Sequence, residues 1–130
     1  MSLDKPMVSV VVPTYNRREK IKEALTSIMR QSLSDVEILI VDDCSTDGTE
    51  KHLQRFVNRD PRFKILRTPE NSNLPAIPRN VGIQQSRGRY VAFLDDDDVW
   101  FSFKLMRQVQ ALERYSALAM VHSRLIAKGN

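Results

Sequence analysis

The chain has few of the residues on which several common kinds of functional site depend. It contains one cysteine, Cys44, which excludes an intrachain disulfide and suits a reducing compartment, so we expect a cytoplasmic protein. Its four glycines form no glycine-rich phosphate loop. Its two histidines, His52 and His122, have no cysteine or second histidine at metal-ligand spacing, and no serine-histidine triad signature is present. These absences argue against a zinc site, a P-loop and a serine hydrolase.

Long apolar runs and blocks of one charge are also missing. No run approaches the ~18 apolar residues that a membrane-spanning helix needs, so we expect none. The formal net charge is +4, but the lysines and arginines are scattered and do not interleave with aromatic residues. We therefore expect no nucleic-acid partner. The basic excess fits anionic phosphates or a membrane surface, with peripheral membrane association arising through regions outside this chain.

Apolar strand-like runs alternate with amphipathic segments along the chain. The runs are rich in β-branched residues, and the amphipathic segments have apolar residues at helical spacing. The predicted strands are residues 8–12, 36–41, 63–67, 90–94 and 117–122, and the predicted helices are residues 17–31, 47–58, 78–88 and 103–112. A chain of 130 residues suits one domain, so we expect residues 1–130 to form a single domain.

This alternation predicts an α/β fold with three layers and a mostly parallel, Rossmann-like sheet. Right-handed crossovers in a doubly wound sheet favour the strand order third, second, first, fourth. Ligands bind such sheets beyond the carboxyl ends of the strands, at the point where the strand order reverses. Three polar segments should meet there: residues 13–17, Asp42 with Asp43, and residues 95–98.

The acidic run, Asp95 to Asp98, is the strongest functional signal. Its four consecutive aspartates directly follow the apolar residues 90–94, where a buried strand should end. Like charges ~4 Å apart repel by about 1 kcal/mol in water and about 4 kcal/mol at an effective dielectric of 20. A bound cation would remove that cost.

The carboxylates of the acidic run differ in their expected direction. If the stretch is extended, Asp95 and Asp97 project to one side and Asp96 to the other. Oxygen ligands favour Mg²⁺ or Mn²⁺, which bind one or two carboxylates together with substrate phosphates. The run therefore predicts a site for a metal diphosphate. Asp98 could instead cap the helix that follows.

Other polar residues near the same edge could contact a nucleotide. Asp42 or Asp43 could accept a hydrogen bond from an imide N–H or a ribose hydroxyl, and spacing does not choose between them; Asp43 could instead cap the turn at Ser45. Tyr15 could stack on a base or simply pack. Arginine makes bidentate bonds to phosphate oxygens, so the diphosphate candidates are Arg17 and Arg79, unless they are ordinary surface arginines.

Four segments of the chain resemble glycosyltransferase family two, in the family's order and spacing. They are residues 8–17 (VSVVVPTYNR), 37–49 (EILIVDDCSTDGT), 79–83 (RNVGI) and 93–98 (FLDDDD). The resemblance implies a nucleotide-diphospho-sugar transferase fold of the GT-A type. It also implies inverting transfer of a sugar from a UDP-type or dTDP-type donor to a glycan or lipid-linked acceptor, in cell envelope polysaccharide biosynthesis.

The resemblance also implies roles for individual residues. Asp95, Asp96 and Asp97 match the family's DXD motif, in which Asp97, with Asp95, would bind Mn²⁺ or Mg²⁺ and Asp96 would lie near the ribose. Asp43 matches the acid that contacts the base, and Tyr15 matches the ring that stacks on it. The positions that line the rest of the donor site are Pro13, Thr14 and Arg79.

The general base implied by the family has no counterpart in this chain. In the family it is a carboxylate from the carboxyl-terminal half, and Glu113, within a predicted helix, does not match it. We expect the base beyond Asn130, and we expect this chain to be the amino-terminal, donor-binding part of a longer enzyme. Such a truncated chain would bind UDP with Mn²⁺ but show little transferase activity.

Three alternatives remain open from the residues. The chain could be a non-catalytic nucleotide-binding module. It could be a phosphatase of the haloacid dehalogenase type with Asp95 as nucleophile, because Asp95, Asp97 and Val99 fit that motif, although there the motif follows the first strand. It could also be a signalling domain with a receiver-like acidic pocket formed by Asp42, Asp43 and Asp95.

Overall fold

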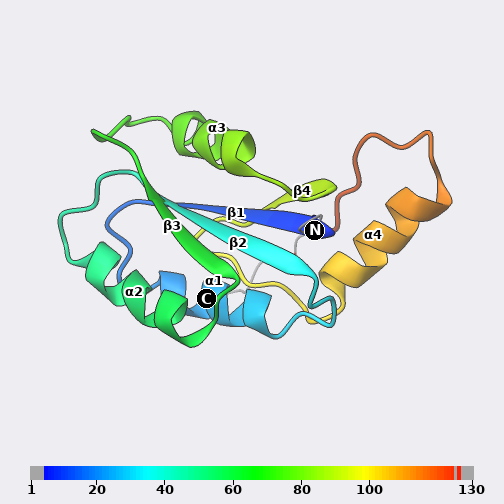
Figure 1. Cartoon of the computed structure of the whole chain (residues 1–130), viewed down its shortest axis with the longest axis horizontal. Coiled ribbons are helices and arrows are strands. Elements are labelled where there is room, and N and C mark those ends of the chain that lie inside the picture. The colour runs from blue at the N-terminus through cyan, green and yellow to red at the C-terminus, as the bar shows by residue number, and fades with distance from the viewer. Residues whose placement is uncertain (1–4, 125, 127–130) are drawn as a thin grey trace.

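The computed structural model describes residues 5–124 and 126, and its centre is a parallel four-stranded sheet (Figure 1). The strands are β1 (Val8–Thr14), β2 (Val36–Asp42), β3 (Phe63–Arg67) and β4 (Tyr90–Phe93). The helices are α1 (Ile21–Met29), α2 (Thr49–Arg59), α3 (Ala76–Gln85) and α4 (Lys104–Arg114). The strand order is β3-β2-β1-β4, which confirms the α/β fold and the predicted order.

Helices cover both faces of the two central strands. Helix α3 lies on one face of the sheet, and α1 and α2 lie on the other (Figure 1). All seven residues of β2 are buried, as are six of the seven in β1. Because both faces of these strands are covered, their sequences are nearly continuous runs of apolar residues.

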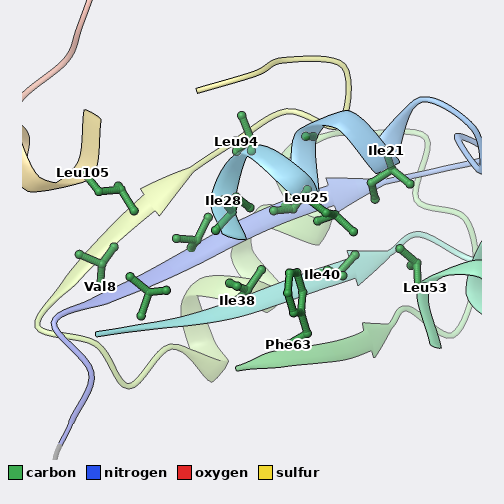
Figure 2. Packing of buried hydrophobic residues seen from close by; sticks show 14 of the residues in the cluster. Val8, Ile21, Leu25, Ile28, Ile38, Ile40, Leu53, Phe63, Leu94 and Leu105 are labelled. Atoms are coloured by element: carbon green, nitrogen blue, oxygen red, sulfur yellow. The ribbon is translucent and has the colours of Figure 1, made fainter. Parts of the chain in front are cut away.

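The larger part of the core lies between the sheet and α1, with α2 and α4 at its borders. Figure 2 shows Ile21, Leu25 and Ile28 of α1 packed over the sheet. Leu53 of α2 and Leu105 of α4 belong to the same cluster. Helix α4 therefore shares a core with the strands, although it follows the acidic run in the chain.

Helix α3 approaches the sheet through a glycine. A Cβ atom at Gly82 would lie 2.3 Å from Cγ1 of Val11 in β1, closer than two carbon atoms can pack. Glycine at this position lets α3 lie directly on the central strand. Arg79, about one helical turn earlier, is thereby carried to the region beyond the carboxyl ends of the strands.

A buried carboxylate joins the amino ends of the strands to the connection between α3 and β4. Glu37 of β2 accepts hydrogen bonds from Ser9 Oγ at 2.5 Å and from Arg87 N at 2.7 Å, and the amide of Gly88 donates to Ser9 Oγ at 2.8 Å. Burial opposes ionisation of Glu37, but the hydrogen bonds and the charge of Arg87 outweigh it and lower the pKa of the carboxyl. The network fixes where β4 begins.

The lowered pKa of Glu37 predicts acid sensitivity. The pKa of Glu37 is lower in the native state than its ordinary value of 4.5 in the unfolded chain. The ionised carboxylate therefore stabilises the fold above about pH 4.5, and this contribution is lost as the pH falls through the native pKa. In urea denaturation at a series of pH values, we expect Glu37→Gln to reduce the decline of the free energy of unfolding below pH 4.5. The control is Glu23→Gln, an exposed position on α1. Equal acid slopes in the two variants would contradict the assignment.

Four local predictions were wrong. Strand β4 stops at Phe93 and is half-exposed rather than fully buried. It is an edge strand, because β1 is its only partner among the described residues. Residues 117–122 form no strand, because they pair with neither edge of the sheet. Helix α1 is shorter than residues 17–31. Helix α3 was predicted at residues 78–88 but covers Ala76–Gln85, and it turns Pro78 and Gly82 toward the sheet because close approach there depends on small residues.

None of the helices in the described part of the chain has the length and hydropathy that crossing a membrane would need.

Candidate functional site

The three predicted polar segments do meet at the carboxyl edge of the sheet. Thr14 at the end of β1 lies opposite Asp42 at the end of β2, and the carbonyl of Thr14 accepts a hydrogen bond from the amide of Asp43 at 2.8 Å. On the other side of β1, the amide of Leu94 donates to the carbonyl of Val11 at 3.1 Å. The acidic run therefore begins beside the end of β1, as the strand order predicted.

The acidic run is a turn and not an extended stretch. The amide of Asp98 donates to the carbonyl of Asp95 at 3.1 Å, which closes the turn directly after the pairing of β4 with β1 has ended. The expectation that Asp95 and Asp97 alternate with Asp96 as in a strand was therefore wrong. Instead, the side chains of Asp95 and Asp96 each have a separate partner.

Asp96 is the inward-facing member of the acidic run. Its Oδ2 accepts a hydrogen bond from Thr14 Oγ1 at 2.7 Å, and its side chain is half-buried. Burial raises the pKa of Asp96, and the charges of Asp97 and Asp95 raise it further, while Thr14 and the charge of Arg17 oppose the shift. A cation bound near the turn would offset the repulsion and favour the ionised carboxylate.

Asp95 is paired with an arginine from α3. Arg79 Nη2 lies 2.6 Å from Asp95 Oδ1, so a predicted diphosphate contact and a predicted metal ligand touch each other directly. Arg79 is thus more than an isolated surface arginine. The pair joins α3 to the turn across the carboxyl edge of the sheet.

Asp97 and Asp98 are the exposed end of the acidic run. Partial burial, together with the charges of Asp97 and Asp95, raises the pKa of Asp98. The predicted role of Asp98 as a helix cap was wrong, because α4 begins only at Lys104 and has Phe103 at its N-cap position.

The carboxylates of the turn fit a divalent cation that takes further ligands from a substrate. Across residues 5–124 and 126, no group of three or more His, Cys, Asp or Glu side chains is placed to hold a metal ion. Asp95 and Asp97 are both exposed and offer hard oxygen ligands. Mg²⁺ and Mn²⁺ commonly bind one or two carboxylates and complete their coordination with water and phosphate oxygens.

The structure separates the roles of Asp42 and Asp43, which spacing could not. Asp42 is fully buried, and its carboxylate accepts from Arg67 Nη1 at 2.6 Å and from the amide of Ser45 at 3.1 Å. The turn-capping role considered for Asp43 therefore belongs to Asp42. Asp43 faces the loop after β3.

Asp43 holds that loop at the carboxyl edge. Its carboxylate accepts from Thr68 Oγ1 at 2.8 Å, from Ser72 Oγ at 2.8 Å and from the amide of Ser72 at 3.1 Å. Asn71 Nδ2 also donates to the carbonyl of Asp43, at 3.3 Å. The amide of Ser72 also lies 3.3 Å from the other carboxylate oxygen, and Asp43 is only 5% exposed, so this loop satisfies and buries most of the carboxylate.

The segment after β1 is locked to the segment after β2. Asn16, at a φ of 49°, donates its amide to Ser45 Oγ at 2.8 Å, and its Oδ1 accepts from the amide of Thr46 at 2.8 Å. Tyr15 precedes Asn16 in the chain and is 43% exposed, so it is accessible to a ligand.

Basic side chains continue from this segment around an open hollow. It has a volume of about 250 Å³ and is lined by Asn16, Arg17, Arg18, Glu19, Lys20 and Asp47. The charge of Arg17 also acts on Asp96, where it partly opposes the rise in the pKa of that carboxyl. Positive charge thus flanks the acidic run on this side.

Pro13 lies within β1, opposite Val41 of β2. The carbonyl of Val11 points toward β4, and residues two apart in a strand point the same way, so the missing N–H of Pro13 faces the side where β4 has already ended. A proline is therefore tolerated in a central strand. Its position places it at the edge of the site without a specific polar contact.

Four polar residues near the site were missed in the sequence. Thr68 and Ser72, which hold Asp43, lie in a loop dense in polar residues after a predicted strand, and that density was a usable signal. Ser27 and Gln31 anchor the segment that follows the acidic run. Gln31 continues the spacing of the buried residues Ile21, Leu25 and Ile28, so a polar residue on an apolar stripe was the signal there.

Comparison with known proteins places the chain in a family. The Glycosyl transferase family 2 model matches residues 9–130. The chain is 42% identical over 125 residues to TuaG of Bacillus subtilis, a glycosyltransferase assigned provisionally to teichuronic acid biosynthesis, with 95% of this chain and 49% of that protein covered. It is 34% identical over 110 residues to WfgD of Escherichia coli, a UDP-Glc:alpha-D-GlcNAc-diphosphoundecaprenol beta-1,3-glucosyltransferase, with 85% and 42% covered.

Solved structures agree with the sequence relatives. S. aureus TarS 1–349 in complex with UDP-GlcNAc superposes with a TM-score of 0.79 at 31% identity, covering 93% of this chain and 37% of that one. The mannosyltransferase PcManGT of Pyrobaculum calidifontis in complex with GDP-Man and Mn²⁺ superposes with a TM-score of 0.76 at 30% identity, covering 85% and 33%. The chain spans about half the length of the first two curated relatives. It belongs to glycosyl transferase family 2 and has the GT-A fold.

Proposed function

We propose that this chain is the donor-binding part of an inverting glycosyltransferase that uses a UDP-sugar and a divalent metal ion. The observation that carries the proposal is the convergence of Thr14, Arg79 and the acidic run at one edge of a parallel sheet. Asp43, on the other side of β1, extends the same edge. Asp43 would face the base of a nucleotide diphosphate, and Arg79 with the acidic run would face its phosphates.

The base end of the proposed site is formed by Asp43 and Tyr15. Thr68 and Ser72 fix the carboxylate of Asp43, which would accept the imide N–H of the base, while the exposed Tyr15 offers a stacking surface. The structural neighbour TarS, solved with UDP and with UDP-GlcNAc, supports uridine as the nucleoside. Thr14 and Pro13 lie between this end and the acidic run.

The diphosphate end is formed by Asp95, Asp97 and Arg79. Asp95 and Asp97 would hold Mn²⁺ or Mg²⁺, which when bound neutralises charge on the departing nucleoside diphosphate. Arg79, whose guanidinium lies against Asp95, adds a positive charge that could contact the phosphate oxygens. Thr14 keeps Asp96 turned inward, near the ribose in our assignment.

The acceptor end of the reaction lies outside this chain in our proposal. An acceptor hydroxyl attacks the anomeric carbon from the face opposite the leaving group, and a carboxylate from the remainder of the protein removes its proton. The names of two relatives contain undecaprenol-linked acceptors, which supports a glycan or lipid-linked acceptor in cell envelope polysaccharide biosynthesis. We further propose a cytoplasmic site of action, at the cytoplasmic face of the membrane in the full-length protein.

Calorimetry with UDP tests the proposal. We expect the chain to bind UDP with a Kd of about 1 μM to 1 mM when Mn²⁺ is present, the usual range for enzyme substrates. Chelating the metal with EDTA should weaken binding at least about tenfold, because the diphosphate then faces uncompensated carboxylates. Binding that is absent, or equal with and without metal, would refute the proposal. Hydrolysis of a generic phosphate ester would favour the phosphatase alternative instead.

A further inference from the structure

The segment that follows the acidic run is held against α1 by two buried polar side chains. Gln31, 7% exposed, donates its Nε2 to the carbonyl of Phe101 at 2.8 Å and accepts at Oε1 from the amide of Leu105 at 3.1 Å. Ser27, 6% exposed, accepts at Oγ from the amide of Trp100 at 3.1 Å. These contacts join residues that are 70 to 74 positions apart in the sequence.

The amide of Leu105 belongs to the first turn of α4, where backbone N–H groups have no partner within the helix. The residue at the N-cap is Phe103, which has no side-chain acceptor, and α4 shows no side-chain cap of its own. Gln31, which lies just after the C-cap of α1, supplies the missing acceptor. The start of α4 is therefore defined by a distant segment and not by its local sequence.

The attachment follows closely on the acidic turn. Trp100 comes two residues after Asp98, and the amide of Ser32 donates to the carbonyl of Ser102 at 2.8 Å, so consecutive backbone groups of this segment are fixed. On the other side, the amide of Leu94 is bonded to β1. The turn thus lies between two anchored points of the backbone.

We infer that Gln31 is a positioning residue for the metal-diphosphate end of the site, through the anchor that it makes with Phe101 and Leu105. An apolar side chain of similar size would fill the same space as Gln31 but could not make its hydrogen bonds. The amide of Gln31 therefore serves to hold the segment in place. The inference rests on the proposed function for its ligand, but the ordering of the turn can be measured without one.

The test is Gln31→Met, with Gln54→Met on the exposed face of α2 as its matched control. Losing the two bonds to the segment should weaken Mn²⁺-dependent binding of UDP about tenfold. Binding of uridine, which engages only the Asp43 end, should stay within about twofold of the unaltered chain. A merely structural role for Gln31 would weaken both ligands equally, and that result would overturn the inference.

Hydrogen exchange separates this inference from the proposed function. The amide of Asp98, which closes the turn, should exchange about tenfold faster in Gln31→Met, while the amide of Ser72 in the Asp43 loop should not change. Unchanged exchange at Asp98 would overturn the inference even if UDP binds. If the unaltered chain binds no UDP, the proposed function fails and the exchange result alone decides the inference. Should Gln31→Met fail to fold, Ser27→Ala removes the acceptor for Trp100 and is judged by the same measurements.

Discussion

A chain carrying Asp97→Asn is expected to lose Mn²⁺-dependent UDP binding by on the order of 100-fold, while its free energy of unfolding stays nearly unchanged. Removing an outer partner of a metal ligand alone typically costs 10-fold to about 100-fold in metal affinity, so loss of a ligand should cost at least the larger figure. Asp97 is exposed in the turn, and its replacement by an isosteric amide leaves the core intact. Calorimetry with UDP and Mn²⁺ measures the first quantity, and urea denaturation measures the second.

The matched control is Asp98→Asn, the neighbouring exposed aspartate. It removes the same charge from the same turn but leaves Asp95 and Asp97 in place. A loss of less than about threefold is expected, because only the general electrostatic attraction is weakened. If both variants lose binding equally, the acidic run acts through its total charge, and the assignment of Asp97 as a ligand is wrong.

Asp43→Ala is expected to lower the free energy of unfolding by about 3 kcal/mol and to abolish measurable binding of uridine. Hydrogen bonds to a charged group contribute about 1.5 to 3 kcal/mol each, and the loop side of these bonds is partly open to water, which reduces their sum. The substitution leaves Thr68 and Ser72 without their acceptor. Urea denaturation measures the stability, and calorimetry with uridine measures the base end alone.

Asp35→Ala provides the comparison, since Asp35 is exposed and accepts one bond from the amide of Met7 at 3.2 Å. It should cost less than about 1 kcal/mol. Asp43→Asn should be intermediate, because an amide keeps one of the two accepting oxygens. If Asp43→Ala binds uridine as tightly as the unaltered chain, Asp43 orders the loop and does not contact the base.

The strand order could be predicted because it depends on features that the sequence displays directly. The apolar runs that became β1 and β2 are buried on both faces, and one helix separates each pair of strands that are consecutive in the chain. Handedness rules then leave few arrangements. The meeting of Thr14 with Asp96 at one edge followed from that order.

The directions of individual side chains could not be predicted, because they depend on contacts between distant segments. Whether Asp95 points to Arg79 depends on how closely α3 approaches β1, which Gly82 decides. The start of α4 depends on Gln31, which lies 74 residues earlier than Leu105. Asp42 and Asp43 are adjacent in sequence, yet one faces Arg67 and the other faces Ser72. Local patterns carry no information about these partners.

The ion pair between Arg79 and Asp95 changes how ligand binding at this edge should be described. With the guanidinium 2.6 Å from Asp95, the carboxylate already has a positive partner before any ligand arrives. In the proposed function, Asp95 would be shared between a divalent ion and Arg79, and Arg79 would be free to contact the phosphates once the ion held Asp95. The metal and the diphosphate would then favour each other's binding, and neither alone should bind as well as the two together.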